Sequence, residues 1–252
     1  MTDSTPLPPL TLRAWLRYDV VARSLDRLRP ATVLEIGCGQ GAFGARVAGR
    51  TAYLGLEPDP ESYAVAAERI SAHGGHVKQA TTRELDPGKG YDLVCAFEVL
   101  EHIEDDRAAL LDWLRFIRPG GHLVISVPAD PSRFGPMDER VGHFRRYSVE
   151  RLESLVRECG LVEVSTTVYG WPLGYALEAV HNWRESRRPS APAEASMAER
   201  TASSGRLIQP TKRATGLAIA AVTVPFRGLQ RLRPTVGIGL VLQARRPAAS
   251  EV

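Results

Sequence analysis

TVLEIGCGQGA, residues 32–42, joins a short apolar run to three closely spaced glycines. The stretch that continues it, GAFGARVAG at 41–49, has the spacing of a short helix and closes on Gly49. Glycines in such a turn let the backbone bend sharply and approach a ligand, and the free N–H groups at the start of a helix favour a carboxylate or a phosphate. The sequence therefore predicts a strand, a ligand-binding turn and a helix.

The same alternation continues on both sides of this unit. Each further strand is predicted from an apolar run with little polar alternation, as expected for strands that are covered on both faces of a parallel sheet. The predicted strands are 52–57, 76–80, 91–97 and 122–128, and the predicted helices are 10–28, 60–71, 105–117 and 149–159. This order indicates an α/β protein with a Rossmann-like, doubly wound, mostly parallel sheet.

The regular alternation of predicted strands and helices ends after residue 128. Residues 129–142 are predicted to form a long loop, and two late runs, 162–170 and 237–245, alternate as strands do. The insertion between them, 171–234, is predicted to act as a lid and to contain a helix at 173–183, a flexible linker at 185–205 and a basic apolar segment at 206–233. We therefore expect an N-terminal helical segment, 1–30, and a core made of 31–170 and 235–246.

Composition is typical of a soluble globular protein, because 44% of the 252 residues are hydrophobic and 24% are charged. Cys38, Cys95 and Cys159 lie far apart and outside any C-x-x-C pair, so neither a disulfide framework nor a metal site is expected. The first ten residues lack the pattern of a secretory signal, and the longest apolar stretch, 216–226, is too short to span a bilayer. We expect a cytoplasmic protein.

The glycine turn alone leaves the ligand open. Gly37, Gly39 and Ala42 also satisfy the G-x-G-x-x-A pattern of a nicotinamide dinucleotide site. Glu57 follows the second predicted strand, about twenty residues beyond Gly37, where a carboxylate can accept both hydroxyls of a ribose. The same carboxylate would repel a ribose phosphate, so any bound nucleoside should carry free hydroxyls there.

Motifs further along the chain separate these alternatives. The strand 91–97 is followed by Glu98-Val99-Leu100-Glu101-His102, and the strand 122–128 is preceded by LRFIRPGG at 114–121. With E-x-G-x-G-x-G at 35–41 and the acid at 57, these motifs resemble the class I S-adenosylmethionine-dependent methyltransferases, in order, through residues 32–128. The resemblance implies a seven-stranded sheet with an antiparallel last strand, in which 162–170 and 237–245 form the final antiparallel pair.

The resemblance also implies a binding site for S-adenosylmethionine. The glycine turn would line the methionine and the adenosine, Glu35 would support the methionine amino end, and Glu57 would bind the ribose. One position departs from the family, since Ala80-Thr81 stands where Gly-Asp is frequent, and Thr81 would therefore contact the adenine only weakly. The full predicted set is Glu35, Gly37, Cys38, Gly39, Gly41, Glu57, Pro58, Thr81, Phe97 and Glu98.

Candidate acceptor residues lie in GHFRRYS, residues 142–148. His143 could take a proton from an acceptor hydroxyl, or it could anchor the next helix by hydrogen bonding. Arg145 and Arg146, with Tyr147 beside them, could bind an anionic acceptor, although adjacent side chains rarely face the same way. His102 is interpreted as a packing residue below the cofactor turn.

The sequence favours methyl transfer to a small-molecule or lipid-like acceptor, at oxygen first and at carbon next. Residues 97–100, FEVL, replace the D/N-P-P-Y/F motif of enzymes that methylate exocyclic amino groups of bases, so a nucleic-acid acceptor is not expected. Two alternatives stay open. One is an NAD-dependent oxidoreductase, for which no hydride-relay pair such as Tyr-x-x-x-Lys is evident, and the other is a non-catalytic protein that binds nucleic acid or an anionic membrane.

Positive charge gathers near the C-terminus. Residues 200–246 contain nine basic residues and no acidic one: Arg200, Arg206, Lys212, Arg213, Arg227, Arg231, Arg233, Arg245 and Arg246. Within 206–233 the cations flank an apolar run, so this segment is either a lid that buries its apolar residues against the sheet or a segment in weak contact with an anionic membrane surface. Because the run 217–224 is apolar on all sides, the pattern favours the lid.

Overall fold

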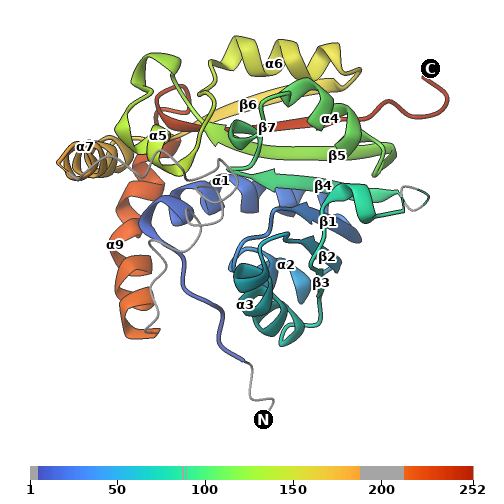
Figure 1. The fold of residues 1–252 in the computed structure, drawn as a ribbon, viewed down its shortest axis with the longest axis horizontal. Coiled ribbons are helices and arrows are strands. Elements are labelled where there is room, and N and C mark those ends of the chain that lie inside the picture. Colours follow the sequence, from blue (N-terminus) through green and yellow to red (C-terminus); the bar gives the residue numbers. More distant parts are fainter. Residues whose placement is uncertain (1–4, 87, 89, 188–212, 252) are drawn as a thin grey trace.

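One sheet organises the part of the chain that the structure describes, residues 5–86, 88, 90–187 and 213–251. Its strands are β1 (Thr32–Ile36), β2 (Ala52–Leu56), β3 (His76–Lys78), β4 (Tyr91–Phe97), β5 (Ile117–Pro128), β6 (Val162–Gly170) and β7 (Gly237–Arg245). The computed structural model places them in the order β3-β2-β1-β4-β5-β7-β6 (Figure 1). Strands β1 to β5 pair in parallel, and β7 is antiparallel to both of its neighbours. The predicted fold class is confirmed.

Helices cover both faces of this sheet. The longer helices are α1 (Leu12–Leu28), α2 (Gly44–Ala48), α3 (Pro60–Ser71), α4 (Asp106–Leu114), α5 (Pro136–Val141), α6 (Val149–Glu158), α7 (Leu173–Glu185) and α9 (Arg213–Arg231), and three single turns are η1 (Thr82–Glu84), η2 (Leu100–His102) and η3 (Pro131–Arg133). One core cluster joins α1, α2 and α3 to one face, and a second joins α4 and α6 to the other.

Burial on both faces explains the apolar runs from which the strands were predicted. In β4, Leu93 and Cys95 belong to the cluster below α1, while Val94 and Ala96 belong to the cluster below α4 and α6. All four side chains are almost fully buried. A strand whose two sides are both covered needs no polar alternation, as in the sheets of doubly wound proteins.

The largest differences from the sequence prediction concern the start of β5 and the loop 129–142. β5 begins at Ile117 rather than 122, because Tyr91 already pairs with Ile117 before a bulge and the main register starts at Leu93 opposite His122. The predicted loop 129–142 contains α5, which has Pro136 in its first turn and ends at Gly142 with a left-handed backbone. A proline at the start of a helix and a glycine just after its end are typical of helix boundaries. The sequence prediction interpreted the same residues as turn residues.

The insertion contributes two described helices, α7 and α9. The linker predicted at 185–205 lies outside the described residues except for its first three positions, 185–187. Within the described part of the chain, no helix is long and apolar enough to cross a membrane. The division of the chain into segment, core and insertion stays a prediction.

Candidate active site

The glycine turn lies between β1 and α2, at the carboxyl edge of the sheet. Gly37, Gly39 and Gly41 all have positive φ, at 68°, 53° and 76°. At Gly37 a side chain would also clash, because a Cβ atom there would lie 2.8 Å from the Val99 side chain. The turn therefore requires glycine for its backbone and for its close packing, and it presents main-chain groups at the edge where ligands bind in doubly wound sheets.

Glu57 follows β2 and stands beside this turn. One carboxylate oxygen accepts a hydrogen bond from the Gly39 N–H at 2.8 Å, and the other accepts from the Asp59 N–H at 3.0 Å. Burial raises the pKa of Glu57 although both N–H groups act in the opposite direction. Each oxygen keeps a lone pair, so the carboxylate can still accept the two hydroxyls of a ribose.

Glu35 and Cys38 lie deeper below the turn. Glu35 is buried and accepts a hydrogen bond from the Tyr53 hydroxyl, and burial raises its pKa to about 8. The Cys38 sulfur fills the space above Gly55, as expected of a small packing residue. The predicted contact of Glu35 with the methionine amino end stays a prediction.

Pro58 and Thr81 lie at the outer rim of this edge. Pro58 is exposed beside Glu57, and Thr81 caps η1 with its hydroxyl and main-chain N–H both directed at the Glu84 carboxylate, each at 2.6 Å. The Thr81 hydroxyl proton is thus already used. The weak adenine contact predicted for Thr81 remains a prediction. In such a contact the Thr81 hydroxyl oxygen would act as a hydrogen-bond acceptor.

Phe97 and Glu98 end β4 at the same edge, and α1 brings a cation to them. Glu98 has φ of 58°, accepts a hydrogen bond from the Ser126 hydroxyl at 2.8 Å and lies 3.4 Å from the Arg17 guanidinium. Sequence analysis missed Arg17, because only tertiary packing places this residue of the N-terminal helix against β4.

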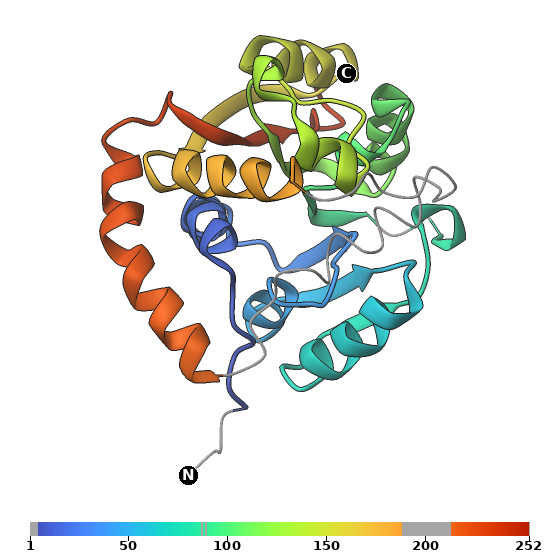
Figure 2. The same ribbon diagram turned by 60° about the vertical axis from the view of Figure 1, so that its left-hand side comes forward.

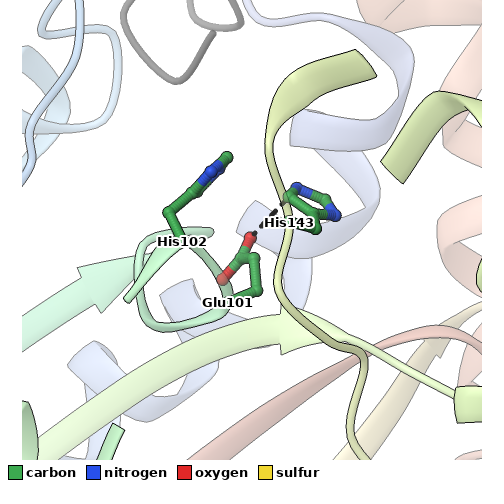
Figure 3. A group of neighbouring side chains, drawn as sticks. All are labelled: Glu101, His102 and His143. Atoms are coloured by element: carbon green, nitrogen blue, oxygen red, sulfur yellow. Dashed lines mark ion pairs between the residues drawn. The ribbon is translucent and has the colours of Figure 1, made fainter. Parts of the chain in front are cut away.

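Glu101, His102 and His143 form a compact group beside this strand end (Figure 3). The first two belong to η2, and His143 follows α5. One ligand atom from each residue lies within 4.8 Å of the others, and His143 Nε2 is 3.8 Å from the Glu101 carboxylate. The Glu101 side chain is 0% exposed, and neither of its oxygens accepts a hydrogen bond within the described residues. Burial, followed by the charge of Glu98, raises its pKa well above the usual range.

Hydrogen bonds orient the two imidazole rings of this group. His102 Nδ1 lies 3.2 Å from the Gly142 carbonyl oxygen, which can only accept, so Nδ1 carries the proton. His143 Nδ1 lies 2.7 Å from Asp138. Although burial raises it, the pKa of Asp138 is held down to about 2 by hydrogen bonds from His143 and Arg146, so this carboxylate is ionised and accepts from Nδ1. In the neutral form of a ring held in this way, Nε2 is the nitrogen that can accept a proton or bind a metal ion.

This arrangement supports two kinds of chemistry. A ring held through Nδ1 by a carboxylate can take a proton at Nε2. Two such rings beside a carboxylate also match the donor set of a divalent metal, whose histidine ligands usually donate their other N–H to a carboxylate or a carbonyl. Burial, followed by the neighbouring His143, lowers the pKa of His102 to about 4, so its ring is neutral at pH 7. Sequence analysis expected no metal site, because these residues are 42 positions apart at most and show no ligand motif.

Arg146 is held inside the protein, which corrects its predicted role. Its guanidinium binds Asp138 in a forked contact at 2.6–3.0 Å and also pairs with Glu178 of α7. All three side chains are buried, and Arg133 pairs with Glu178 from the other side. Arg146 therefore ties α7 to α5 and fixes the carboxylate that orients His143, rather than binding an acceptor.

Arg145 and Tyr147 are also committed to contacts within the protein. The Tyr147 side chain is buried and its hydroxyl donates to Asp106 at 3.0 Å. Arg145 pairs with the same carboxylate at 2.9 Å and donates to the Glu104 carbonyl oxygen. The predicted acceptor contacts of these two residues are therefore not supported, and both anchor the segment that carries His143.

The fold and the site together indicate the class of protein to which this chain belongs. A glycine turn after β1, an acid after β2 and an antiparallel β7 between β5 and β6 are the features of a nucleoside-binding α/β transferase. A family model described as a methyltransferase domain matches residues 12–166, and this chain belongs to that family, the class I S-adenosylmethionine-dependent methyltransferases.

Curated relatives agree with this family. The chain is 33% identical over 121 residues to a ubiquinone biosynthesis O-methyltransferase of Bradyrhizobium sp. (strain ORS 278), a match that covers 44% of this chain and 45% of the relative. It is 31% identical over 173 residues to a "Probable S-adenosylmethionine-dependent methyltransferase" of Mycobacterium tuberculosis, covering 66% and 62%. The chain thus spans about half to three fifths of the length of these relatives.

Solved structures share the fold at low identity. The N-methyltransferase NodS from Bradyrhizobium japonicum, in complex with S-adenosylhomocysteine, has 18% identity and a TM-score of 0.53, with 90% of this chain and 86% of that chain covered. A Haemonchus contortus phosphoethanolamine N-methyltransferase in complex with S-adenosylmethionine has 15% identity and a TM-score of 0.57, with 97% and 54% covered. At these identities the likeness concerns the fold alone.

Proposed function

We propose that this protein transfers the methyl group of S-adenosylmethionine to a hydroxyl oxygen of a small-molecule or lipid-like acceptor. The observation that carries the proposal is His143, whose Nδ1 lies 2.7 Å from the ionised Asp138 and whose Nε2 keeps its lone pair near the strand end at Phe97 and Glu98. A hydroxyl needs such a base, because it must lose its proton as the new bond forms. The named O-methyltransferase relative supports oxygen as the acceptor atom.

S-adenosylmethionine supplies an electrophilic methyl group on a positively charged sulfur. His143 Nε2 would accept the hydroxyl proton as the oxygen attacks the methyl carbon, so that the carbon–oxygen bond forms while the carbon–sulfur bond breaks. The electron pair of the broken carbon–sulfur bond stays on sulfur, which becomes neutral. Asp138 would stabilise the imidazolium that results, as the orienting carboxylate does in hydrolase triads. Glu57 would hold the ribose, and Phe97 would help to exclude water.

Glu101 supports a second way to activate the acceptor. Glu101 is fully buried without a hydrogen-bond donor among the described residues, which disfavours its charged form, and a bound cation would stabilise the carboxylate. Glu101, His102 and His143 would together hold a divalent metal such as Zn²⁺ or Mn²⁺ and leave open positions. A hydroxyl bound there would lose its proton more easily, and water could then take the proton in place of His143.

Chelation distinguishes these two routes. If the metal is used, prolonged dialysis against EDTA should lower the methyl-transfer rate by about a hundredfold, and Zn²⁺, Mn²⁺ or Mg²⁺ should restore it. Glu101→Gln should then lose metal binding, measured by elemental analysis of the purified protein, while Glu139→Gln on the adjacent α5 should not. Full activity after dialysis, with no metal in the preparation, would leave His143 alone as the activating group.

A set of soluble probes tests the proposed reaction. The protein is incubated with S-adenosylmethionine and, separately, a catechol, a primary alkylamine and a 1,3-diketone, and the products are analysed by mass spectrometry and fragmentation. We expect a methyl ether from the catechol and no methylated amine. An N-methyl product formed faster than the ether would contradict oxygen as the acceptor, and a C-methyl product would favour the carbon acceptor that the sequence placed second.

A further inference from the structure

Helix α9 is anchored to the protein by several polar contacts. Gln230 is 2% exposed, and its amide donates to the Leu16 carbonyl oxygen at 3.0 Å and to Asp19 at 3.2 Å. Its amide oxygen accepts from the Gly170 N–H at 3.1 Å. Arg231 pairs with the same Asp19, and Thr223 is fully buried. The contact between α9 and the body of the protein therefore combines these polar groups with apolar ones, since Gly216 is buried and Phe226 packs against the core cluster below α1.

The opposite side of α9 is apolar and exposed. Leu217 is 65% exposed, Val222 57% and Val224 55%, and Leu232 just beyond the helix is 76% exposed. Between residues 217 and 229 the exposed side chains belong to Leu217, Ala218, Ala221, Val222, Val224, Pro225 and Leu229, and none of them is charged or polar. We call this set the outer face of α9. The sequence favoured burial of the apolar run under a lid, whereas the structure leaves Leu217, Val222 and Val224 exposed and buries Ile219 and Phe226 only in part.

The outer side departs from the usual pattern of a surface helix, whose solvent-facing side is polar. Figure 2 shows α9 along one edge of the molecule, where only its inner side meets other elements, chiefly α1. Five of the twelve large hydrophobic side chains that are exposed in the described residues belong to α9 or lie one residue beyond it. A contiguous exposed apolar strip of this kind marks a contact surface rather than chance exposure.

Charge around the outer face favours an anionic partner. The described segment 213–236 contains four arginines and no acid. Two of them lie flat on aromatic rings beside the helix, with the Arg227 guanidinium 4.9 Å from the Trp15 ring centroid and that of Arg233 4.9 Å from Trp171. A second copy of this helix laid on the first would bring arginines against arginines with no acid between them. An acidic surface meets them with opposite charge.

We propose that the outer face of α9 docks on an anionic lipid surface, with the helix lying in the plane of the interface. Its apolar side chains would enter the headgroup boundary, and the exposed residues Arg231 and Arg233 would remain near the lipid phosphates. Such a helix lies on the membrane and does not span it, in agreement with the absence of a spanning helix among the described residues. The outer face of α9 contains none of the residues assigned to methyl transfer, and the proposal does not depend on that chemistry.

Vesicle co-sedimentation tests this proposal with the full chain and without cofactor or acceptor. Wild-type protein should pellet with vesicles of phosphatidylglycerol and phosphatidylcholine in equal amounts, and its partition coefficient should fall at least about tenfold on pure phosphatidylcholine or at about 0.5 M salt. The variant Leu217→Gln/Val222→Gln/Val224→Gln should lose about tenfold or more on the anionic vesicles. Because these three side chains are more than half exposed, we expect its thermal unfolding to match the wild type.

Leu111→Gln/Val180→Gln is the matched control, since it makes two exposed apolar residues polar on the other helices α4 and α7. It should bind vesicles as the wild type does. Equal binding by the wild type and the triple variant would overturn the proposal. So would a wild type that ignores vesicles but forms a dimer by light scattering that the triple variant cannot form, because the occupant of the outer face would then be a second copy.

Discussion

Replacing His143 with alanine should lower the rate constant of methyl transfer by about a hundredfold while the affinity for S-adenosylhomocysteine stays within about twofold. The imidazole is oriented through Nδ1 by Asp138 at 2.7 Å, and its Nε2, 3.8 Å from Glu101, is the proposed proton acceptor. Removing it leaves the cofactor turn and Glu57 intact. The loss should therefore fall on the chemical step, which single-turnover kinetics separates from cofactor binding.

His143→Gln and His76→Ala control for structural effects. Glutamine keeps a side-chain N–H that can donate to Asp138 but has no basic nitrogen, so its rate should fall as far as that of alanine while the fold is retained. His76 is an exposed histidine of the edge strand β3, and its loss should leave the rate unchanged. A rate within about threefold of wild type in His143→Gln would return His143 to an anchoring role.

Replacing Arg146 with methionine should lower the free energy of unfolding by about 3 to 5 kcal/mol. The variant leaves the Asp138 carboxylate buried without its forked partner and leaves Glu178 with Arg133 alone. A buried charge that loses its partner keeps its desolvation cost, which accounts for the size of the effect. Urea unfolding measures it, and the midpoint should shift with little change of slope.

Two further variants control for this result. One removes a surface ion pair, and the other removes all three charges of the buried network. Arg157→Met removes an exposed pair with Glu153 four residues away on α6, and it should cost about 0.5 kcal/mol or less. Asp138→Asn/Arg146→Met/Glu178→Gln removes all three charges and should be less destabilised than Arg146→Met alone. A loss below about 1 kcal/mol in Arg146→Met would show that the network contributes little to stability.

Local sequence patterns were sufficient to predict the parallel strands and the glycine turn, and the antiparallel last strand followed from the family resemblance. The strands are buried on both faces, so their composition carries the signal without reference to distant residues, and the positive φ values of Gly37, Gly39 and Gly41 match a turn that only glycine adopts easily. Ser148, a residue type that often precedes a helix, caps α6 by accepting a hydrogen bond from the Arg151 N–H. In each case the residues that determine the local structure lie within a few positions of it in the sequence.

The structure of the predicted acceptor-binding segment depends on contacts between residues that are far apart in the sequence. Arg146 was predicted to bind an acceptor because a pair of arginines resembles an anion site, and its buried partners Asp138 and Glu178 could not be inferred from spacing. The orientation of α9 escaped prediction for a related reason, since a helix that is apolar on nearly all sides carries no periodic signal for its inner face. Glu98 and Glu101, three residues apart beside a histidine, were the available sign of a polar cluster after β4.

Calorimetric titration of S-adenosylhomocysteine and of NAD⁺ tests the central claim, that this chain holds the nucleoside of S-adenosylmethionine between the glycine turn and Glu57. Wild-type protein should bind S-adenosylhomocysteine and give no heat with NAD⁺. Because Glu57 would accept both ribose hydroxyls, Glu57→Ala should bind S-adenosylhomocysteine about tenfold to a hundredfold more weakly, which is about 1.5 to 3 kcal/mol. Tight binding of NAD⁺ by the wild type, with none of S-adenosylhomocysteine, would contradict the account.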